Sequence, residues 1–264
     1  MTALFRSPDS APDETSTARL STPENFRDLG GLRSPLGSVR RGLVFRSDDL
    51  ATAPAEFTES MVSEHRIAHV IDLRGAEELS FTGRGPLATA SVTYHHIPVA
   101  DDLAPSNRGP ARSTEEMGAS YARFTELAAP RWAMALSLVA SAEGGVVFHC
   151  AAGKDRTGIL AALILSALDV PVADISADYA RTDQVLTAVN ARIVELVQAV
   201  HAPRYAGQPP LPPDSPVVRP FAATMTAYQR ILTERHGHVL GPVRAAGLSP
   251  AVEQRLRDRL IDGA

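Results

Sequence analysis

The residues best suited to chemistry lie in one short segment around the single cysteine of the chain. In the stretch His-Cys-Ala-Ala-Gly-Lys-Asp-Arg-Thr-Gly, Cys150 is followed after five residues by Arg156. A cysteine thiolate is a strong nucleophile, and an arginine guanidinium group binds two oxygens of a phosphate at once. By itself this spacing is a weak signal, but the pair is consistent with a reactive thiolate beside a group that binds phosphate.

The backbone around Cys150 is expected to bind the same anion. An apolar run, Val146–His149, predicts a buried strand before the cysteine, and the apolar segment Thr157–Leu168 predicts a helix after it. A turn between a strand and a helix N-terminus aims successive N–H groups at one point, where the helix dipole adds positive potential and holds the cysteine as a thiolate. The candidate phosphate-binding residues are Ala151, Ala152, Gly153, Lys154, Asp155, Arg156 and Thr157.

Strands that alternate with helices must position this loop. Helices are expected from Pro54 to His65, from the capping pair Ser113 and Glu116, and from Pro130 to the glycines at 144 and 145. The pattern predicts an α/β fold with a mainly parallel central sheet flanked by helices. The four expected strands are Leu43–Arg46, Ala68–Leu73, Val92–Val99 and Val146–His149.

The C-terminal part of the chain is expected to be helical. Helical spacing runs over Gln184–Val200, resumes at Phe221, and starts again at the Ser249-Pro250 cap. Six prolines in 208–220 exclude a helix there. We expect a flexible tail over 1–20 and a single domain over 21–264, with no internal repeat.

Composition excludes several classes of protein. The 26 Lys and Arg against 30 Asp and Glu leave a net charge of −4, without the basic excess of a nucleic-acid-binding protein. One cysteine allows neither an intrachain disulfide nor a multi-cysteine zinc site. No apolar run approaches the roughly 20 residues of a membrane-spanning helix, and the N-terminus lacks the features of a Sec-type signal. We expect a cytoplasmic protein with no metal, cofactor, nucleic-acid partner or integral membrane segment; its oligomeric state is not indicated.

The core HCAAGKDRTG resembles the protein-tyrosine-phosphatase superfamily. Lys154 and Asp155 before the arginine are similar to its bacterial tyrosine/serine phosphatase branch of the mycobacterial type. The segments Asn25–Gly31, Leu43–Ser47 and Val70–Arg74 are also similar, so the likeness runs from about residue 21 to the C-terminus. This resemblance implies a phosphatase that hydrolyses phosphotyrosine, with phosphoserine, phosphothreonine and phosphoinositides as further candidate substrates. It also includes phosphatases exported without a Sec-type signal.

The resemblance implies a role for each residue of the loop. Cys150 attacks phosphorus to form a phosphocysteine, while Arg156 and the loop amides hold the transferred group. Asp155 is the implied general acid, which later activates water. His149 and Thr157 would tune the thiolate by hydrogen bonding, and Lys154 would contact polyanionic substrates.

Some roles have competing interpretations. Asp101 and Asp102, after the third strand, are a rival source of the general acid or form a solvated turn. Arg27 and Arg46 either add positive potential to the pocket or brace loops as ion pairs. His149 is equally explained as a buried structural histidine, and Lys154 as a solvated loop charge.

Other functions also remain open. The same loop suits a small-metabolite phosphatase or a phosphate-binding pseudophosphatase, although retention of Cys150, Asp155 and Arg156 argues against the latter. A rhodanese-like sulfurtransferase also uses a cysteine in such a loop, but Arg156-Thr157-Gly158 argues against it. The helix Gln184–Val200 resembles the start of a helical lid that would span 184–235. The prolines in 208–220 depart from the family, which has a second lid helix there. The alternative is that Gln184–Val200 is a plain core helix.

Overall fold

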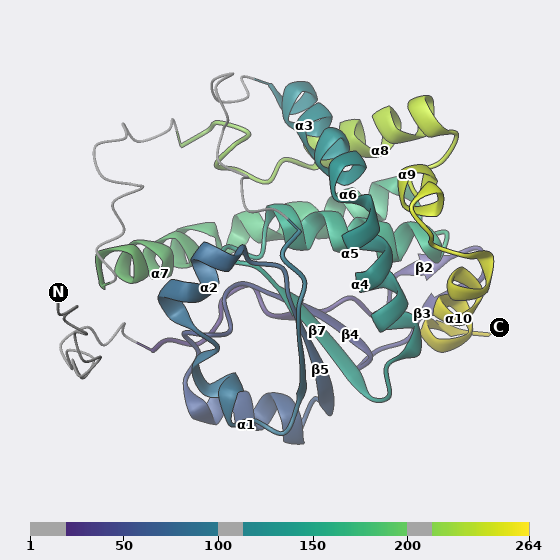
Figure 1. The fold of residues 1–264 in the computed structure, drawn as a ribbon. Coiled ribbons are helices and arrows are strands. Elements are labelled where there is room, and N and C mark those ends of the chain that lie inside the picture. Colours follow the sequence, from purple (N-terminus) through teal and green to yellow (C-terminus); the bar gives the residue numbers. More distant parts are fainter. Residues whose placement is uncertain (1–19, 100–112, 200–212, 264) are drawn as a thin grey trace, which may run out of the picture.

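A five-stranded sheet forms the centre of the computed structural model, which describes residues 20–99, 113–199 and 213–263 (Figure 1). Its strand order is β1-β4-β7-β5-β6; β1 is antiparallel to β4 and the other neighbours are parallel. The prediction of a mainly parallel α/β sheet is therefore confirmed. The strands are β1 (Arg27–Asp28), β4 (Val44–Ser47), β5 (Ile67–Asp72), β6 (Thr93–His96) and β7 (Gly145–His149).

Helices cover both faces of this sheet, with α1 on one side and α4 and α5 on the other (Figure 1). The helices are α1 (Ala55–Ser63), α2 (Ala76–Thr82), α3 (Thr114–Leu127), α4 (Ala129–Ser141), α5 (Asp155–Ala167), α6 (Val172–Ala180), α7 (Leu186–Ala199), α8 (Ala222–His236), α9 (Gly241–Ala245) and α10 (Pro250–Leu260), with 3₁₀ turns η1 (Gly85–Ala88) and η2 (Arg181–Gln184).

The two faces of the sheet follow the alternation of side chains along each strand. Phe45, Val70 and Val147 belong to a small cluster that includes Met61 of α1. Their apolar neighbours along the strands belong to the larger core on the other face; these are Val44, Ile71, Val146 and Phe148. Because successive side chains of a strand face opposite sides, a strand that is apolar throughout must be covered on both.

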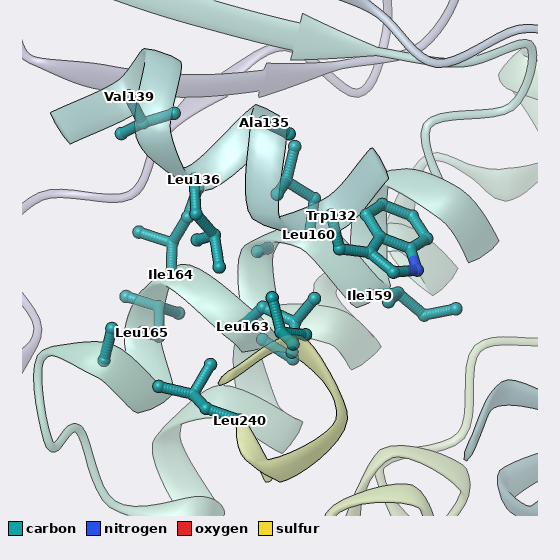
Figure 2. Packing of buried hydrophobic residues seen from close by; sticks show 14 of the residues in the cluster. Trp132, Ala135, Leu136, Val139, Ile159, Leu160, Leu163, Ile164, Leu165 and Leu240 are labelled. Atoms are coloured by element: carbon teal, nitrogen blue, oxygen red, sulfur yellow. The ribbon is translucent and has the colours of Figure 1, made fainter. Parts of the chain in front are cut away.

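The larger core lies between α4 and α5 (Figure 2). Trp132 and Leu136 of α4 face Leu160 and Leu163 of α5, and all four side chains are fully buried. Every residue from Arg156 to Ala167 is buried, which explains the nearly continuous apolar sequence of this helix. The helix that carries the candidate phosphate loop is thus held rigidly in the core.

Local sequence signals place several helix starts correctly. Ser113 accepts a hydrogen bond from the Glu116 N–H over 3.1 Å and caps α3. Ser249 likewise caps α10, with Pro250 in its first turn. These caps are confirmed because each depends on residues within a few positions of one another.

The structure contains several elements that the sequence did not predict, among them the two-residue strand β1 and helix α6. A small second sheet, β2-β3-β8, joins the N-terminal part of the chain to the segment after α10, where only helix was expected. Helix α2 and the short helix α9 were not expected at all. Within the span suggested as a lid, α8 buries Met225, Tyr228 and Leu232 in the core. The additional strands are β2 (Arg33–Ser34), β3 (Gly37–Val39) and β8 (Ile261–Asp262).

The described part of the proline-rich segment, 213–220, contains turns without a helix, as predicted. The tail at 1–19 and residues 208–212 lie outside the described residues, and the division into one domain stays a prediction. None of the helices that the structure describes has the length and hydropathy needed to span a bilayer.

Candidate active site

Cys150 lies where β7 ends, just before α5, at the carboxyl edge of the parallel strands (Figure 1). Its side chain is buried, with 2 % of its surface exposed. The hydroxyl of Thr157, in the first turn of α5, donates a hydrogen bond to the Cys150 Sγ over 3.1 Å. Thr157 is therefore in direct contact with the sulfur, and its role in tuning the cysteine stays a prediction.

Gly153 determines the shape of the loop after the cysteine. Its φ of 64° lies in the left-handed region, and a Cβ at this position would lie 2.5 Å from the Ser47 carbonyl oxygen. Both conditions require glycine. Its carbonyl accepts hydrogen bonds from Asn25 Nδ2 (3.0 Å) and Arg46 Nη2 (2.9 Å). The loop is therefore fastened to the segments that precede β1 and end β4.

A buried ion cluster connects this loop to β1, β4 and α6. Arg46 Nη1 donates to Asp178 Oδ2 over 2.6 Å, and Arg27 Nε donates to Oδ1 over 2.9 Å. Burial alone would raise the pKa of Asp178, but Arg46 and Arg27 outweigh it and hold that pKa below its usual value. Burial and the nearby Arg46 lower the pKa of Arg27 to about 10, so it stays charged at neutral pH. Both arginines therefore form ion pairs that hold β1, β4 and α6 together.

The Arg156 guanidinium group is held by a glutamate that the sequence analysis missed. Glu78 of α2 accepts hydrogen bonds from both terminal nitrogens of Arg156, with 2.7 Å between Nη2 and Oε1. Burial alone would raise the pKa of Glu78, but the contact with Arg156 outweighs it and holds that pKa below its usual value. Glu78 Oε2 also accepts the Gly75 N–H at 2.7 Å, so the same carboxylate caps α2. Spacing from Gly75 to Glu78 could have indicated the helix start, but no local signal indicates the partner.

Asp155 is the first residue of α5, and its carboxylate faces two neighbours. The Tyr121 hydroxyl donates to Oδ1, and Lys154 Nζ lies 3.4 Å from the same oxygen. The Lys154 ammonium group also donates to the carbonyls of Val217 and Val218. With its side chain 5 % exposed, Lys154 connects the loop to the 213–220 segment, whereas the sequence suggested a substrate contact or a solvated charge.

Comparison with known proteins identifies the family of the chain. A sequence model described as the tyrosine phosphatase family matches residues 18–262. The chain belongs to this family. It is 27 % identical to the triple specificity protein phosphatase PtpB of Mycobacterium tuberculosis over 90 % of this chain and 96 % of that protein. It is 35 % identical to a putative tyrosine-protein phosphatase of Cupriavidus necator over 62 % of each chain.

Solved structures were also found. The Siw14 catalytic core matches with a TM-score of 0.39 and 16 % identity, covering 82 % of this chain and 95 % of that one. The TpbA phosphatase of P. aeruginosa matches with a TM-score of 0.30 and 14 % identity, covering 61 % of this chain and 86 % of that one. The chain is thus a phosphatase-family hydrolase on the strength of its sequence match.

In this phosphatase, His149 packs beside the cysteine without touching its sulfur. Its Nδ1 lies 3.3 Å from the Cys150 carbonyl oxygen, and its Nε2 lies 3.8 Å from Asp72 Oδ2. Burial lowers the pKa of His149, which favours the neutral ring. Arg74 joins Asp72 to Asp49 in the same buried network. The contacts of His149 are therefore those of a structural residue, and they do not include the predicted hydrogen bond to the thiolate.

The remaining predicted residues lie outside this cluster. Asp101 and Asp102 fall beyond the described residues, so the rival general acid stays untested. Helix α7, the candidate lid, is fastened to the body through Arg192, which pairs with Asp48 and donates to the Asp49 carbonyl over 3.1 Å. No group of three or more metal-ligating side chains occurs in the ranges that the structure describes.

Removing the charge of Asp178 should destabilise the protein strongly. Asp178→Asn removes the counter-charge of Arg27 and Arg46. Water cannot replace it, because the side chains of Arg46 and Asp178 are only 0 % and 4 % exposed. We expect a loss of about 3 to 5 kcal/mol in the free energy of unfolding at pH 7, measured by urea denaturation. Because the folded-state pKa of Asp178 is depressed, its contribution is complete above about pH 4 and is lost as the pH falls further.

A matched control is the surface ion pair of Asp262 with Arg40, whose side chains are 66 % and 40 % exposed. Asp262→Asn should change stability by less than about 1 kcal/mol. Equal losses in the two variants, or a difference that does not shrink below about pH 4, would contradict the assignment.

Proposed function

We propose that this protein is a cysteine-based phosphatase that hydrolyses phosphomonoesters through a phosphocysteine intermediate and needs no metal ion for this reaction. The observation that carries the proposal is the arrangement of Cys150, Arg156 and Asp155 on one loop and the first turn of one helix. The Cys150 sulfur accepts the Thr157 hydroxyl, and the Arg156 side chain is oriented by Glu78.

Arg156 has a free edge for substrate. Glu78 takes the end of the guanidinium group that carries Nη1 and Nη2. The Nε–H of Arg156 donates no hydrogen bond to any residue that the structure describes, which leaves the side edge, Nε–H with one Nη–H, for two phosphate oxygens. Burial alone would lower the pKa of Arg156, but Glu78 and the Cys150 charge outweigh it and raise that pKa. The guanidinium group is therefore always charged.

The reaction follows from these positions in two steps. The Cys150 thiolate attacks phosphorus; the S–P bond forms, the P–O bond to the leaving group breaks, and Asp155 gives its proton to the leaving oxygen. A water molecule then attacks phosphorus, its proton passes to Asp155, and the S–P bond breaks to release inorganic phosphate. The loop amides and Arg156 hold the phosphoryl oxygens in both steps.

Phosphotyrosine is the proposed substrate class, supported by membership in the tyrosine phosphatase family. The mycobacterial relative is named a triple specificity phosphatase, and this breadth supports including phosphoserine, phosphothreonine and phosphoinositides in the proposal. The contacts of Lys154 matter for phosphoinositides, because its ammonium group already donates to the Val217 and Val218 carbonyls. A second phosphate on the substrate would have to replace these bonds, so we place singly phosphorylated compounds first.

The test is release of inorganic phosphate from a panel of compounds, with and without EDTA. The panel contains phosphotyrosine and phosphoserine peptides, phosphoinositides, nucleotides and small sugar phosphates. We expect release from the phosphotyrosine peptide at a rate that EDTA does not change. Loss of activity on chelation would contradict the metal-independent mechanism, and release from sugar phosphates alone would favour a small-metabolite phosphatase.

A further inference from the structure

The Asp155 carboxylate is held by a chain of two tyrosines from two other helices. Tyr121 of α3 donates its hydroxyl to Asp155 Oδ1. The Tyr179 hydroxyl of α6 lies 2.8 Å from the Tyr121 hydroxyl. Three elements that are distant in sequence therefore meet at the first residue of the helix that follows the phosphate loop.

The direction of these hydrogen bonds is determined by counting protons. A tyrosine hydroxyl has one proton to donate, and that of Tyr121 goes to the carboxylate. Tyr179 must therefore donate to the Tyr121 oxygen. Burial first, and the Asp155 charge second, raise the pKa of both tyrosines well above the usual value, so both keep their protons at neutral pH. Donors in series strengthen one another.

Packing prevents both rings from turning away. Tyr121 and Tyr179 are 2 % and 1 % exposed, and their rings meet edge to face at 6.2 Å. The glycine that closes the loop motif, Gly158, makes room for Tyr179: a Cβ there would lie 2.8 Å from the Tyr179 ring. The motif glycine and the tyrosine pair thus belong to one arrangement.

The two oxygens of Asp155 are used differently. Oδ1 receives the Tyr121 hydroxyl and faces Lys154, whereas Oδ2 accepts no hydrogen bond from any residue that the structure describes. The side chain is 29 % exposed, although the tyrosines behind it are buried. One oxygen is therefore held in place and the other stays accessible.

We propose that Tyr121, supported by Tyr179, is the positioning residue that aims the free oxygen of Asp155 at the leaving group. This inference rests on the proposed function, in which Asp155 is the general acid. Proton transfer requires the carboxyl group within hydrogen-bond reach of the leaving oxygen, and a carboxyl that rotates freely spends little time there. Tyr121 itself does not touch the substrate.

The experiment compares Tyr121→Phe with Tyr228→Phe on a series of aryl and alkyl phosphates. Tyr228 is the matched control, since it is a buried tyrosine whose hydroxyl lies 3.1 Å from Thr125 Oγ1 and whose ring contacts that of Tyr121. Nitrophenolate departs without protonation, whereas phenolate and alkoxide need a proton. We expect Tyr121→Phe to lower kcat/KM about 10-fold for phenyl and alkyl phosphates and less than about 3-fold for nitrophenyl phosphate. Tyr228→Phe should leave the whole series unchanged.

A loss that is equal across the series, or equal in the two variants, would show a purely structural role and overturn the inference. If Tyr121→Phe does not melt cooperatively, Tyr179→Phe takes its place, with the same leaving-group pattern at about 3-fold. Asp155→Asn in the same series distinguishes failure of the general-acid assignment from failure of the positioning role of Tyr121. If the loss depends on the leaving group in Asp155→Asn but not in the tyrosine variants, only the positioning role of Tyr121 is overturned. If the loss in Asp155→Asn does not depend on the leaving group, Asp155 is not the general acid and the positioning role is overturned with it.

Discussion

Replacing Cys150 with serine is expected to lower phosphate release by a factor of about 10⁴ or more on every substrate, because removing the nucleophile of a covalent hydrolase costs up to about 10⁶ in kcat. Among the residues that the structure describes, no base is hydrogen-bonded to the Cys150 sulfur that could activate a serine hydroxyl there, whereas the proposed mechanism uses the more nucleophilic thiolate. The measurement is single-turnover release of phosphate from a radiolabelled phosphotyrosine peptide, with a search for labelled protein in acid-quenched wild type.

The change should leave the fold intact. Serine is close to cysteine in volume, and Thr157, which lies 3.1 Å from the sulfur, can still donate to the new oxygen. The reverse exchange, Ser166→Cys at the other end of α5, is a suitable control because Ser166 is also buried. Its activity should equal that of wild type. Activity that survives in Cys150→Ser would overturn the proposed mechanism.

The second large effect is expected for Arg156→Lys, which should lower kcat/KM by about 10³. Lysine keeps the positive charge, but its ammonium group lacks the planar fork that lets one edge bind two phosphate oxygens while the end binds Glu78. The variant therefore tests whether the shape of the guanidinium group, rather than its charge, does the work. Steady-state kinetics on phosphotyrosine peptide give the result.

Arg230→Lys is the matched control for this change. Arg230 also binds carboxylates, those of Glu115 and Glu234, but its side chain is 45 % exposed and lies on α8. Its kcat/KM should not change. A fall of less than about 10-fold in Arg156→Lys would show that charge alone suffices and that the bidentate contact is not used.

The fold class and the position of the loop after Cys150 could be predicted because their signals are local. Alternation of short apolar strands with amphipathic helices indicates a covered parallel sheet, and the position of Cys150 between β7 and α5 follows from two neighbouring apolar runs. The short strands β1, β2, β3 and β8 were missed because two or three residues carry no usable period.

The partners of the loop residues could not be predicted in the same way. Nothing near Glu78 indicates that it orients Arg156, because the contact forms only when α2 packs beside the loop. Lys154 has a sequence context that suits a substrate contact, yet its donors go to Val217 and Val218 carbonyls. A side chain's partner depends on which distant segment fills the space around it.

By itself, the sequence determined the strand–loop–helix that carries Cys150, Arg156 and Asp155, since these residues are adjacent and the hydrogen bonds of the helix arise among near neighbours. The tertiary structure alone decided how Asp155 and Arg156 are oriented. Tyr121 of α3 and Glu78 of α2 are far from them in sequence and contact them only in the folded chain. The direction of a side chain is a property of the packing around it, and packing is a long-range outcome of folding.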